Sequence, residues 1–115
     1  MPLISVVETP SYLADAEKTL SQTERDAVID MLAENPRLGV IIKGSGGLRK
    51  LRIGMDGRGK RGGGRVIYWF HSEGCPVVLL AMFAKNEASD LTAKEYAVLA
   101  KVAEHLLHDF KRKLQ

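Results

Sequence analysis

The sequence predicts an α+β protein in which helices pack on one mostly antiparallel sheet. Strand-like segments follow one another directly in the second half of the chain, and the helical segments are kept apart from them. The expected order of elements is therefore β-α-α-β-β-β-α. The chain has 115 residues, of which 45% are hydrophobic, and it shows no internal repeat. We expect a single domain over residues 1–115, with a modest core.

The first half of the chain is expected to form one strand and two helices. The segment Leu3–Thr9 is short, rich in β-branched residues and bounded by prolines, which is typical of a strand. A short helix should follow over Tyr12–Leu20. Ser21 lies three residues before Glu24, the spacing of a capping box, so a second helix should begin there. It should end near Pro36, because proline disfavours helical geometry in the residue before it.

The second half is expected to form three strands and a final helix. Leu48–Ile53 and Arg65–Phe70 have strand propensity, and Cys75–Ala84 is so apolar that both its faces should be covered. The short HSEG turn between the last two predicts an antiparallel hairpin. Thr92 opens a second capping box, and an apolar stripe then continues to about Lys113.

Composition excludes several classes of protein and of site. No apolar run approaches the roughly 18 residues of a membrane span, and the N-terminal residues lack the features of a signal peptide. The single cysteine, Cys75, has no partner for an internal disulfide. No group of His, Cys, Asp and Glu has metal-ligand spacing. We expect a cytoplasmic protein without a membrane partner, a metal or a cofactor.

Positive charge is concentrated in one segment. Between Lys43 and Arg65 there are eight Lys or Arg and one acid, Asp56, which gives this segment a net charge of +7. The whole chain carries only +3, so the remainder is mildly acidic at −4. A concentrated cationic segment is the expected electrostatic footprint of a phosphate-rich partner.

The glycine-rich part of this segment, GRGKRGGG, is not a nucleotide-binding P-loop. Arg61 stands where that motif requires Ser or Thr, and a strand rather than a helix follows. A disordered basic arm is also disfavoured, because RVIYWF follows directly and has strong strand propensity. The glycines are better explained as a connection between two paired strands.

Strand alternation predicts that four cations gather on one surface. Lys50 and Arg52 share one face of their strand, while Leu51 and Ile53 share the other face, toward the helices. The cations should therefore point to an open face of the sheet. Arg65 opens the next strand, and Lys85 directly follows the apolar strand.

Such a cluster suits the cleavage of RNA without a metal. When the 2′-OH attacks the adjacent phosphorus, negative charge builds on the phosphorane oxygens and on the leaving 5′ oxygen, and fixed cations stabilise that charge. A lysine crowded by other cations should have a lowered pKa, so that it shares in proton transfer near neutral pH.

Three segments in this order, NPRLGVIIKGSGGLRKLRI, GRGKRGGGRVIYWF and AKNEASDLTAKE, resemble the HigB-type toxins of the RelE superfamily. The resemblance covers roughly residues 35–95. It implies the compact RelE-like fold, with a small twisted antiparallel sheet, two N-terminal helices against it and a C-terminal helix. It also implies the toxin of a type II toxin–antitoxin module, an mRNA interferase that cuts the message in the ribosomal A site and so inhibits translation.

The resemblance also implies partners and residue roles. The partners would be the ribosome with its mRNA and a HigA-type helix-turn-helix antitoxin, with operator DNA reached only through the antitoxin. The two basic strand positions of the family fall on Lys50 and Arg52, the arginine opening the next strand on Arg65, and the basic residue after the last strand on Lys85. The chain departs from the wider family at Asn86, where many relatives have arginine, and it lacks the tyrosine expected near Thr92.

Six other residues are predicted to contact RNA: Arg49, Arg58, Lys60, Arg61, Tyr68 and Asn86. The cations of the glycine loop suit binding to the RNA backbone better than placing a proton. Tyr68 is a candidate for base stacking, although its alternation with Val66 and Phe70 favours a place in the core. Two other functions are alternatives, and the first explains the charge equally well. One is a basic module that binds RNA or the ribosome without cutting, and the other is a structural subunit that only regulates DNA binding by its antitoxin.

Overall fold

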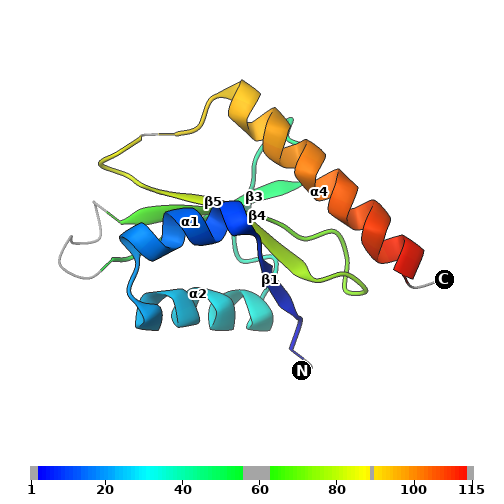
Figure 1. Ribbon diagram of the computed structural model, residues 1–115, viewed down its shortest axis with the longest axis horizontal. Coiled ribbons are helices and arrows are strands. Elements are labelled where there is room, and N and C mark those ends of the chain that lie inside the picture. The colour runs from blue at the N-terminus through cyan, green and yellow to red at the C-terminus, as the bar shows by residue number, and fades with distance from the viewer. Residues whose placement is uncertain (1–2, 56–62, 89, 114–115) are drawn as a thin grey trace.

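A computed structural model of the chain describes residues 3–55, 63–88 and 90–113 (Figure 1). The sheet has five strands in the order β1-β5-β4-β3-β2, and helices cover both of its faces. The elements in chain order are β1 (Val6–Glu8), α1 (Pro10–Thr19), α2 (Gln22–Glu34), β2 (Val40–Ile41), β3 (Leu48–Ile53), β4 (Gly64–Trp69), β5 (Val77–Ala84) and α4 (Ala93–Lys113). The predicted α+β class is confirmed.

The central part of the sheet is an antiparallel meander of β3, β4 and β5. Both edge strands differ from what the sequence predicts. β1 is shorter than expected and pairs in parallel with β5, placing Val6 opposite Val77. β2 was not predicted, because two residues are too few to show an alternating pattern. It pairs antiparallel with β3, placing Val40 opposite Lys50.

The helices begin where side-chain caps satisfy their free amides. The hydroxyl of Thr9 accepts a hydrogen bond from the amide of Tyr12, and proline occupies the first turn, so α1 starts two residues earlier than predicted. Both predicted capping boxes are confirmed. In the first, the Ser21 hydroxyl and the Glu24 carboxylate each bond the other residue's amide.

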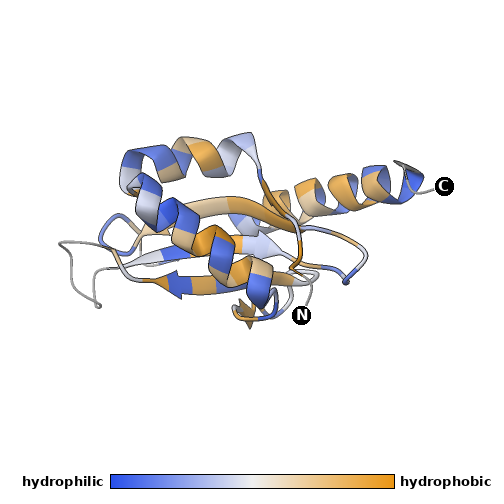
Figure 2. Cartoon of the chain, turned by 90° about the horizontal axis from the view of Figure 1, so that it is seen from below, coloured by the Kyte–Doolittle hydropathy of each residue, from blue (hydrophilic) through white to orange (hydrophobic). Residues whose placement is uncertain are grey.

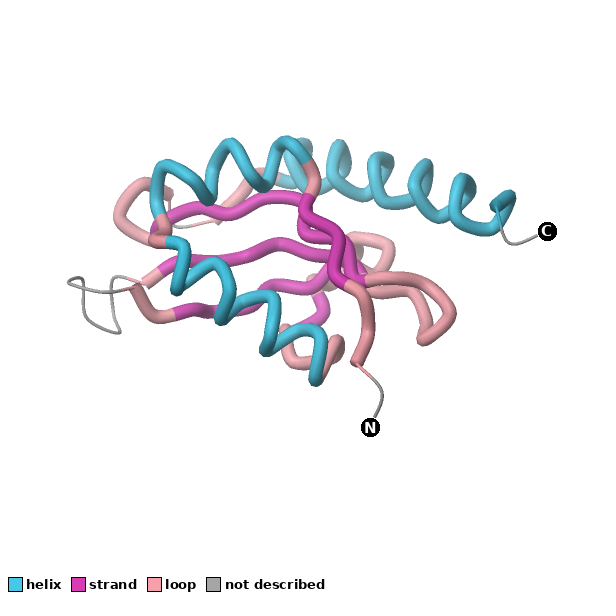
Figure 3. The backbone as a smooth tube through the Cα atoms, turned by 60° about the horizontal axis from the view of Figure 1, so that its bottom comes forward, coloured by secondary structure: helices cyan, strands magenta, loops and turns pink. Residues whose placement is uncertain are grey.

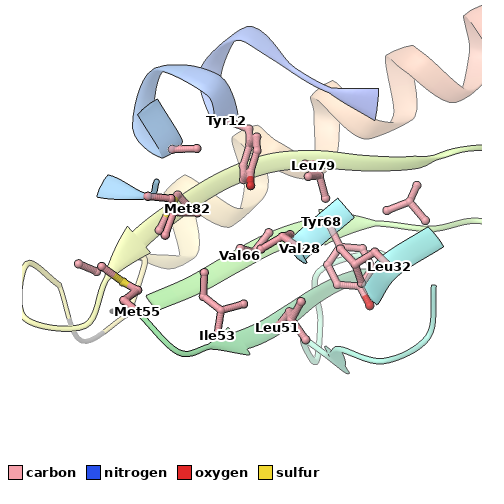
Figure 4. Close-up of a cluster of buried hydrophobic side chains, with 14 of the residues drawn as sticks. Tyr12, Val28, Leu32, Leu51, Ile53, Met55, Val66, Tyr68, Leu79 and Met82 are labelled. Carbon is pink, nitrogen blue, oxygen red and sulfur yellow. The ribbon is translucent and has the colours of Figure 1, made fainter. Parts of the chain in front are cut away.

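The main core lies between the sheet and the α1–α2 pair (Figures 1 and 4). Tyr12 of α1 and Leu32 of α2 face the inward side chains of the strands, including Leu51 and Val66 (Figure 4). Each fully buried aliphatic side chain contributes about 1.5–3 kcal/mol to folding. The prediction that Leu51 and Ile53 face the helices is confirmed.

The opposite face of the sheet is covered in part by α4, so it is not open as predicted. Figure 3 shows α2 in front of the strands and α4 behind them. The apolar stripe of α4, including Leu99 and Ala103, packs against Leu48, Ile67 and Trp69. This cover agrees with the apolar sequence of β5 and with the burial of β4 along its whole length (Figure 2). In the part of the chain that the structure describes, no helix has the length and apolar character needed to cross a bilayer.

A tight turn sets the start of β3. Gly44, Gly46 and Gly47 have φ angles of 75°, 77° and 105°, a region that side chains with a Cβ atom rarely adopt. The Ser45 hydroxyl donates to the carbonyl of Ile42 and accepts from the amide of Leu48 at 3.1 Å. This turn returns the chain from β2 into β3, the strand that carries two of the predicted site residues.

Candidate functional site

Three of the four predicted catalytic cations meet on the α4 face of the sheet. Lys50 and Arg52 lie on β3, and Arg65 lies on β4 directly opposite Arg52 in the pairing register. Together with Val40, Ile41 and Ile42 they line a cavity of about 290 Å³. The cavity thus combines an apolar wall from the β2 region with cations from two neighbouring strands.

The two arginines of this cavity differ in burial. Arg65 is only 7% exposed, and its Nη1 donates to the carbonyl of Gly64 at 3.1 Å. Arg52 is exposed. A buried guanidinium held by the strand suits fixed stabilisation of charge, since its geometry is set before a ligand arrives. An exposed guanidinium on the neighbouring strand suits the first contact with a phosphate.

Lys85 lies at the end of β5 and does not line the cavity. Its amide donates to the carbonyl of Gly63 at 2.9 Å, which continues the pairing of β5 with β4 beyond Ala84. Its side chain is exposed. Because Arg65 pairs with Phe83, Lys85 stands two residues beyond the partner of Arg65. Its catalytic role stays a prediction.

Arg49 has a different task from the RNA contact predicted for it. It neighbours Lys50 on β3, so its side chain leaves the opposite face of the sheet. Its Nη1 donates to the carbonyl of Gly39 at 2.7 Å and to that of Arg37 at 3.2 Å. Arg49 therefore holds the segment that leads into β2, and this placement argues against direct contact with RNA.

The predicted stacking of a base on Tyr68 is wrong. The side chain has no exposed surface, and its hydroxyl donates to the carbonyl of Pro36 and accepts from the amide of Gly39, both at 2.8 Å. Burial raises the pKa of this phenol. A Cβ atom on Gly39 would lie 2.7 Å from the ring, so the glycine is required for this contact.

The remaining predicted RNA contacts are only partly described. Arg58, Lys60 and Arg61 lie outside the described residues. Asn86 is exposed and directly follows Lys85 at the end of β5. Its contact with RNA stays a prediction.

Sequence reasoning missed two residues that contact the cluster, Asp90 and Tyr96. The Nζ atom of Lys50 lies 2.9 Å from Oδ1 of Asp90, and the Tyr96 hydroxyl donates to the same oxygen. Lys50 Nζ also lies 5.7 Å from the centre of the Tyr96 ring. Asp90 belongs to the connection between β5 and α4, and Tyr96 to the first turns of α4 (Figure 1, yellow to orange). Their contact depends on how α4 crosses the sheet, which no local pattern reveals.

These contacts set the charges of the three groups. The Tyr96 hydroxyl and then the Lys50 ammonium hold the pKa of Asp90 down to about 2. Partial burial lowers the pKa of Lys50, but the hydrogen bonds to Asp90 and Tyr96 outweigh it, and the net shift is upward. Burial, followed by the bond to Asp90, raises the pKa of Tyr96. The lowered lysine pKa that the sequence predicts is therefore wrong for Lys50, which is an ammonium at neutral pH.

A larger cavity, of about 660 Å³, lies at the hairpin end of β4 and β5. It is lined by residues of the N-terminal segment, the end of α2 and the β4–β5 hairpin, and it contains none of the predicted site residues. The cavity of about 290 Å³ is the better candidate site, because it joins Lys50, Arg52 and Arg65. Among the described residues, no three His, Cys, Asp or Glu side chains are grouped so that they could hold a metal ion.

Comparison with known proteins identifies the family and supports the fold. Residues 15–115 match the family model of the RelE toxin of the RelE/RelB toxin–antitoxin system. A solved structure of an E. coli RelE mutant in the free state has a similar fold, with a TM-score of 0.56 at 16% sequence identity. That match covers 76% of this chain and 88% of the E. coli chain. The family match spans most of the sequence, and the chain belongs to the RelE toxin family.

Proposed function

We propose that this chain is a HigB-type toxin that cleaves mRNA in the ribosomal A site as a metal-independent endoribonuclease. RelE family membership supports ribosome-dependent cleavage of mRNA at the level of the family. The observation that carries the proposal is the cavity in which Lys50, Arg52 and Arg65 converge from two paired strands.

The cleavage itself is an internal transfer at phosphorus. The 2′ oxygen forms a bond to phosphorus and the bond to the 5′ oxygen breaks, leaving a cyclic phosphate and a free 5′ hydroxyl. The 2′ hydroxyl loses a proton and the 5′ oxygen gains one. Arg65 and Arg52 suit the stabilisation of the phosphorane oxygens. Lys50 carries a proton at neutral pH. It therefore suits the role of an acid that protonates the leaving 5′ oxygen, and not the role of a base.

The partners follow from the same proposal. The ribosome carrying its mRNA is the target, which places the toxin in the cytoplasm. A HigA-type helix-turn-helix antitoxin neutralises it, and the pair reaches operator DNA through the antitoxin.

Induced expression with mapping of message ends tests this function. Wild-type protein should stop growth and produce new 5′ ends within codons at the A site. Arg65→Ala and Arg52→Ala should each reduce the cleavage rate by about 100-fold, as expected when a stabilising cation is lost. Arg112→Ala, at the exposed C-terminal end of α4, removes the same charge far from the cavity and should remain fully toxic.

Binding of antitoxin and an unchanged melting temperature would show that the inactive variants are folded. Growth arrest without new 5′ ends would contradict cleavage and would show that the protein blocks translation without cutting the message. Unchanged growth, with soluble protein present, would leave only the role of a co-repressor subunit.

A further inference from the structure

Lys50 is held by contacts from two elements other than its own strand. Lysine has a flexible four-carbon stem, so its ammonium group is poorly fixed unless neighbours restrain it. Here the carboxylate of Asp90 lies 2.9 Å from Nζ on one side, and the Tyr96 ring lies 5.7 Å away. The Lys50 side chain is 28% exposed, and Asp90 is 51% exposed.

We propose that Asp90 and Tyr96 are positioning residues that fix the Lys50 ammonium at the rim of the cationic cavity. The inference deepens the proposed function and rests on it, since Lys50 is placed for phosphodiester cleavage. Neither Asp90 nor Tyr96 lines the cavity. They act on the reaction through Lys50.

The carboxylate is itself anchored. The amide of Leu91 donates to Oδ1 of Asp90 at 2.8 Å. Two residues further on, the Thr92 hydroxyl accepts from the amide of Glu95 at 3.1 Å, while the Glu95 carboxylate accepts from the amide of Thr92 at 2.9 Å. This capping box sets the first turn of α4 and so places Tyr96 against Asp90. The arrangement is a chain of contacts from a rigid helix start to a flexible lysine.

The charged groups around Lys50 explain why such restraint is useful. Arg52 on the same strand and Arg65 on β4 line the same cavity and repel the ammonium, while the β2 region contributes only apolar side chains there. Asp90 from the connection and Tyr96 from α4 are the groups that offset this repulsion. Without them Lys50 is free to turn away from the two arginines.

The alternative is that Asp90 competes with RNA for Lys50. The two possibilities predict opposite effects of Asp90→Asn on the cleavage rate. Removing a negative charge beside a phosphate site strengthens RNA binding by simple electrostatics. If Asp90 only competes with RNA, Asp90→Asn should therefore cleave faster. If Asp90 positions Lys50, the maximal rate should fall even though binding is unchanged or tighter.

The kinetic experiment uses full-length toxin on ribosomes programmed with a defined mRNA. Asp90→Asn should lower kcat by about 10- to 100-fold, the range expected when a catalytic group is displaced by about 1 Å. Its KM should be equal to or below that of the wild type. Tyr96→Phe keeps the ring beside Lys50, so its kcat should fall less than that of Asp90→Asn. Asp90→Glu keeps the carboxylate, so its kcat should lie between those of Asp90→Asn and the wild type.

Asp109→Asn is the matched control, since Asp109 lies in the last turns of α4 and pairs with Arg112 at 4.0 Å. Its kcat and KM should equal those of the wild type. A rate for Asp90→Asn equal to or above that of the wild type would overturn the positioning role.

A second measurement separates this inference from the proposed function. NMR titration of lysines labelled at the ε carbon, with Lys50→Arg to assign the signal, reports the protonation of Lys50 directly. The pKa of Lys50 should lie above its ordinary 10.5 in the wild type and fall in Asp90→Asn. An ordinary Lys50 titration that Asp90→Asn leaves unchanged would overturn the inference even if the toxin cleaves mRNA. Absence of cleavage by the wild type would overturn the proposed function, and the titration would still decide whether Asp90 and Tyr96 hold Lys50.

Discussion

Two buried tyrosines of the main core differ in what their hydroxyl groups contact. The hydroxyl of Tyr68 bonds both Pro36 and Gly39. The hydroxyl of Tyr12 is buried and has no hydrogen-bond partner among the described residues, and burial, with the nearby Glu8 carboxylate, raises the pKa of Tyr12 to about 12. The hydroxyl group thus stabilises the fold at Tyr68 and destabilises it at Tyr12.

Replacing each tyrosine by phenylalanine should separate these two cases. Tyr68→Phe leaves the buried amide of Gly39 without its acceptor, so we expect a loss of about 1–3 kcal/mol in the free energy of unfolding. Tyr12→Phe should cost little or should stabilise the protein, because no described bond is lost. Urea unfolding of the two variants measures the difference. Equal losses would show that the Tyr68 hydrogen bonds do not stabilise the fold.

The depressed pKa of Asp90 means that part of the free energy of unfolding should be lost at acid pH. Its pKa is depressed to about 2 in the folded chain, so the stabilisation is complete above the ordinary carboxyl value of 3.8 and is lost as the pH falls toward 2. The carboxylate is half-exposed, so after screening by solvent the contribution is at most about 1 kcal/mol.

Comparison of the wild type with Asp90→Asn between pH 5 and pH 2 tests this. The difference in the free energy of unfolding between the two proteins should shrink as the pH falls. A difference that is constant over this range would mean that Asp90 has an ordinary pKa.

At the scale of the elements, the start of α4 connects the fold with the site. Thr92 caps this helix, and Tyr96 stands one turn further along it. Thr92→Ala should cost about 1 kcal/mol of stability, the usual value of an N-cap. Hydrogen exchange should accelerate in the first turn of α4, and the NMR signal of Lys50 should shift.

Ser21→Ala is the matched control, because it removes the same kind of cap from α2 on the other face of the sheet. It should destabilise by a similar amount and leave Lys50 undisturbed. An equal effect of both variants on Lys50 would show that the α4 cap has no special connection with the site.

The strands of the sheet differ in how far local sequence determines them. Leu48–Ile53 was predicted with its correct bounds, since alternation and the flanking glycines are local signals. Alternation also places Lys50 and Arg52 on one face of the sheet. The position of Arg65 beside Arg52 follows from the antiparallel pairing of β3 and β4. The partners of Lys50 were not predictable, because Asp90 lies 40 residues away and meets Lys50 only through the packing of α4. Alternation also separates Arg49 from Lys50, but only the structure shows that Arg49 bonds the carbonyls of Arg37 and Gly39.

At the scale of the whole molecule, positive charge is concentrated in one segment of a protein of low net charge. The chain carries +3 overall but +7 between Lys43 and Arg65, and the cavity is lined by three cations of this segment. Each cation that contacts phosphate on single-stranded RNA releases counterions when it binds. The site can therefore be mapped by salt dependence, one residue at a time.

Binding of a short single-stranded RNA should weaken linearly on a plot of log affinity against log salt. Arg52→Ala should reduce the slope by about 0.7, the value of one phosphate contact on single strands. Arg112→Ala should leave the slope unchanged, because Arg112 lies in the last turn of α4. Equal slopes for Arg52→Ala and the wild type would remove Arg52 from the RNA interface.

The crossing of α4 over the sheet also has a consequence for the order in which the site is assembled. Ribosomes make the chain from its N-terminus, so Lys50, Arg52 and Arg65 are synthesised before Asp90 and Tyr96. A growing chain that has just completed β5 contains the three cations but not the pair that holds Lys50. Because Tyr96 lies on α4, this pair can join the cations only after the strands of the sheet have been synthesised and α4 has begun to form. The proposed site is therefore assembled in two stages, first the cations on the sheet and then the pair that holds Lys50.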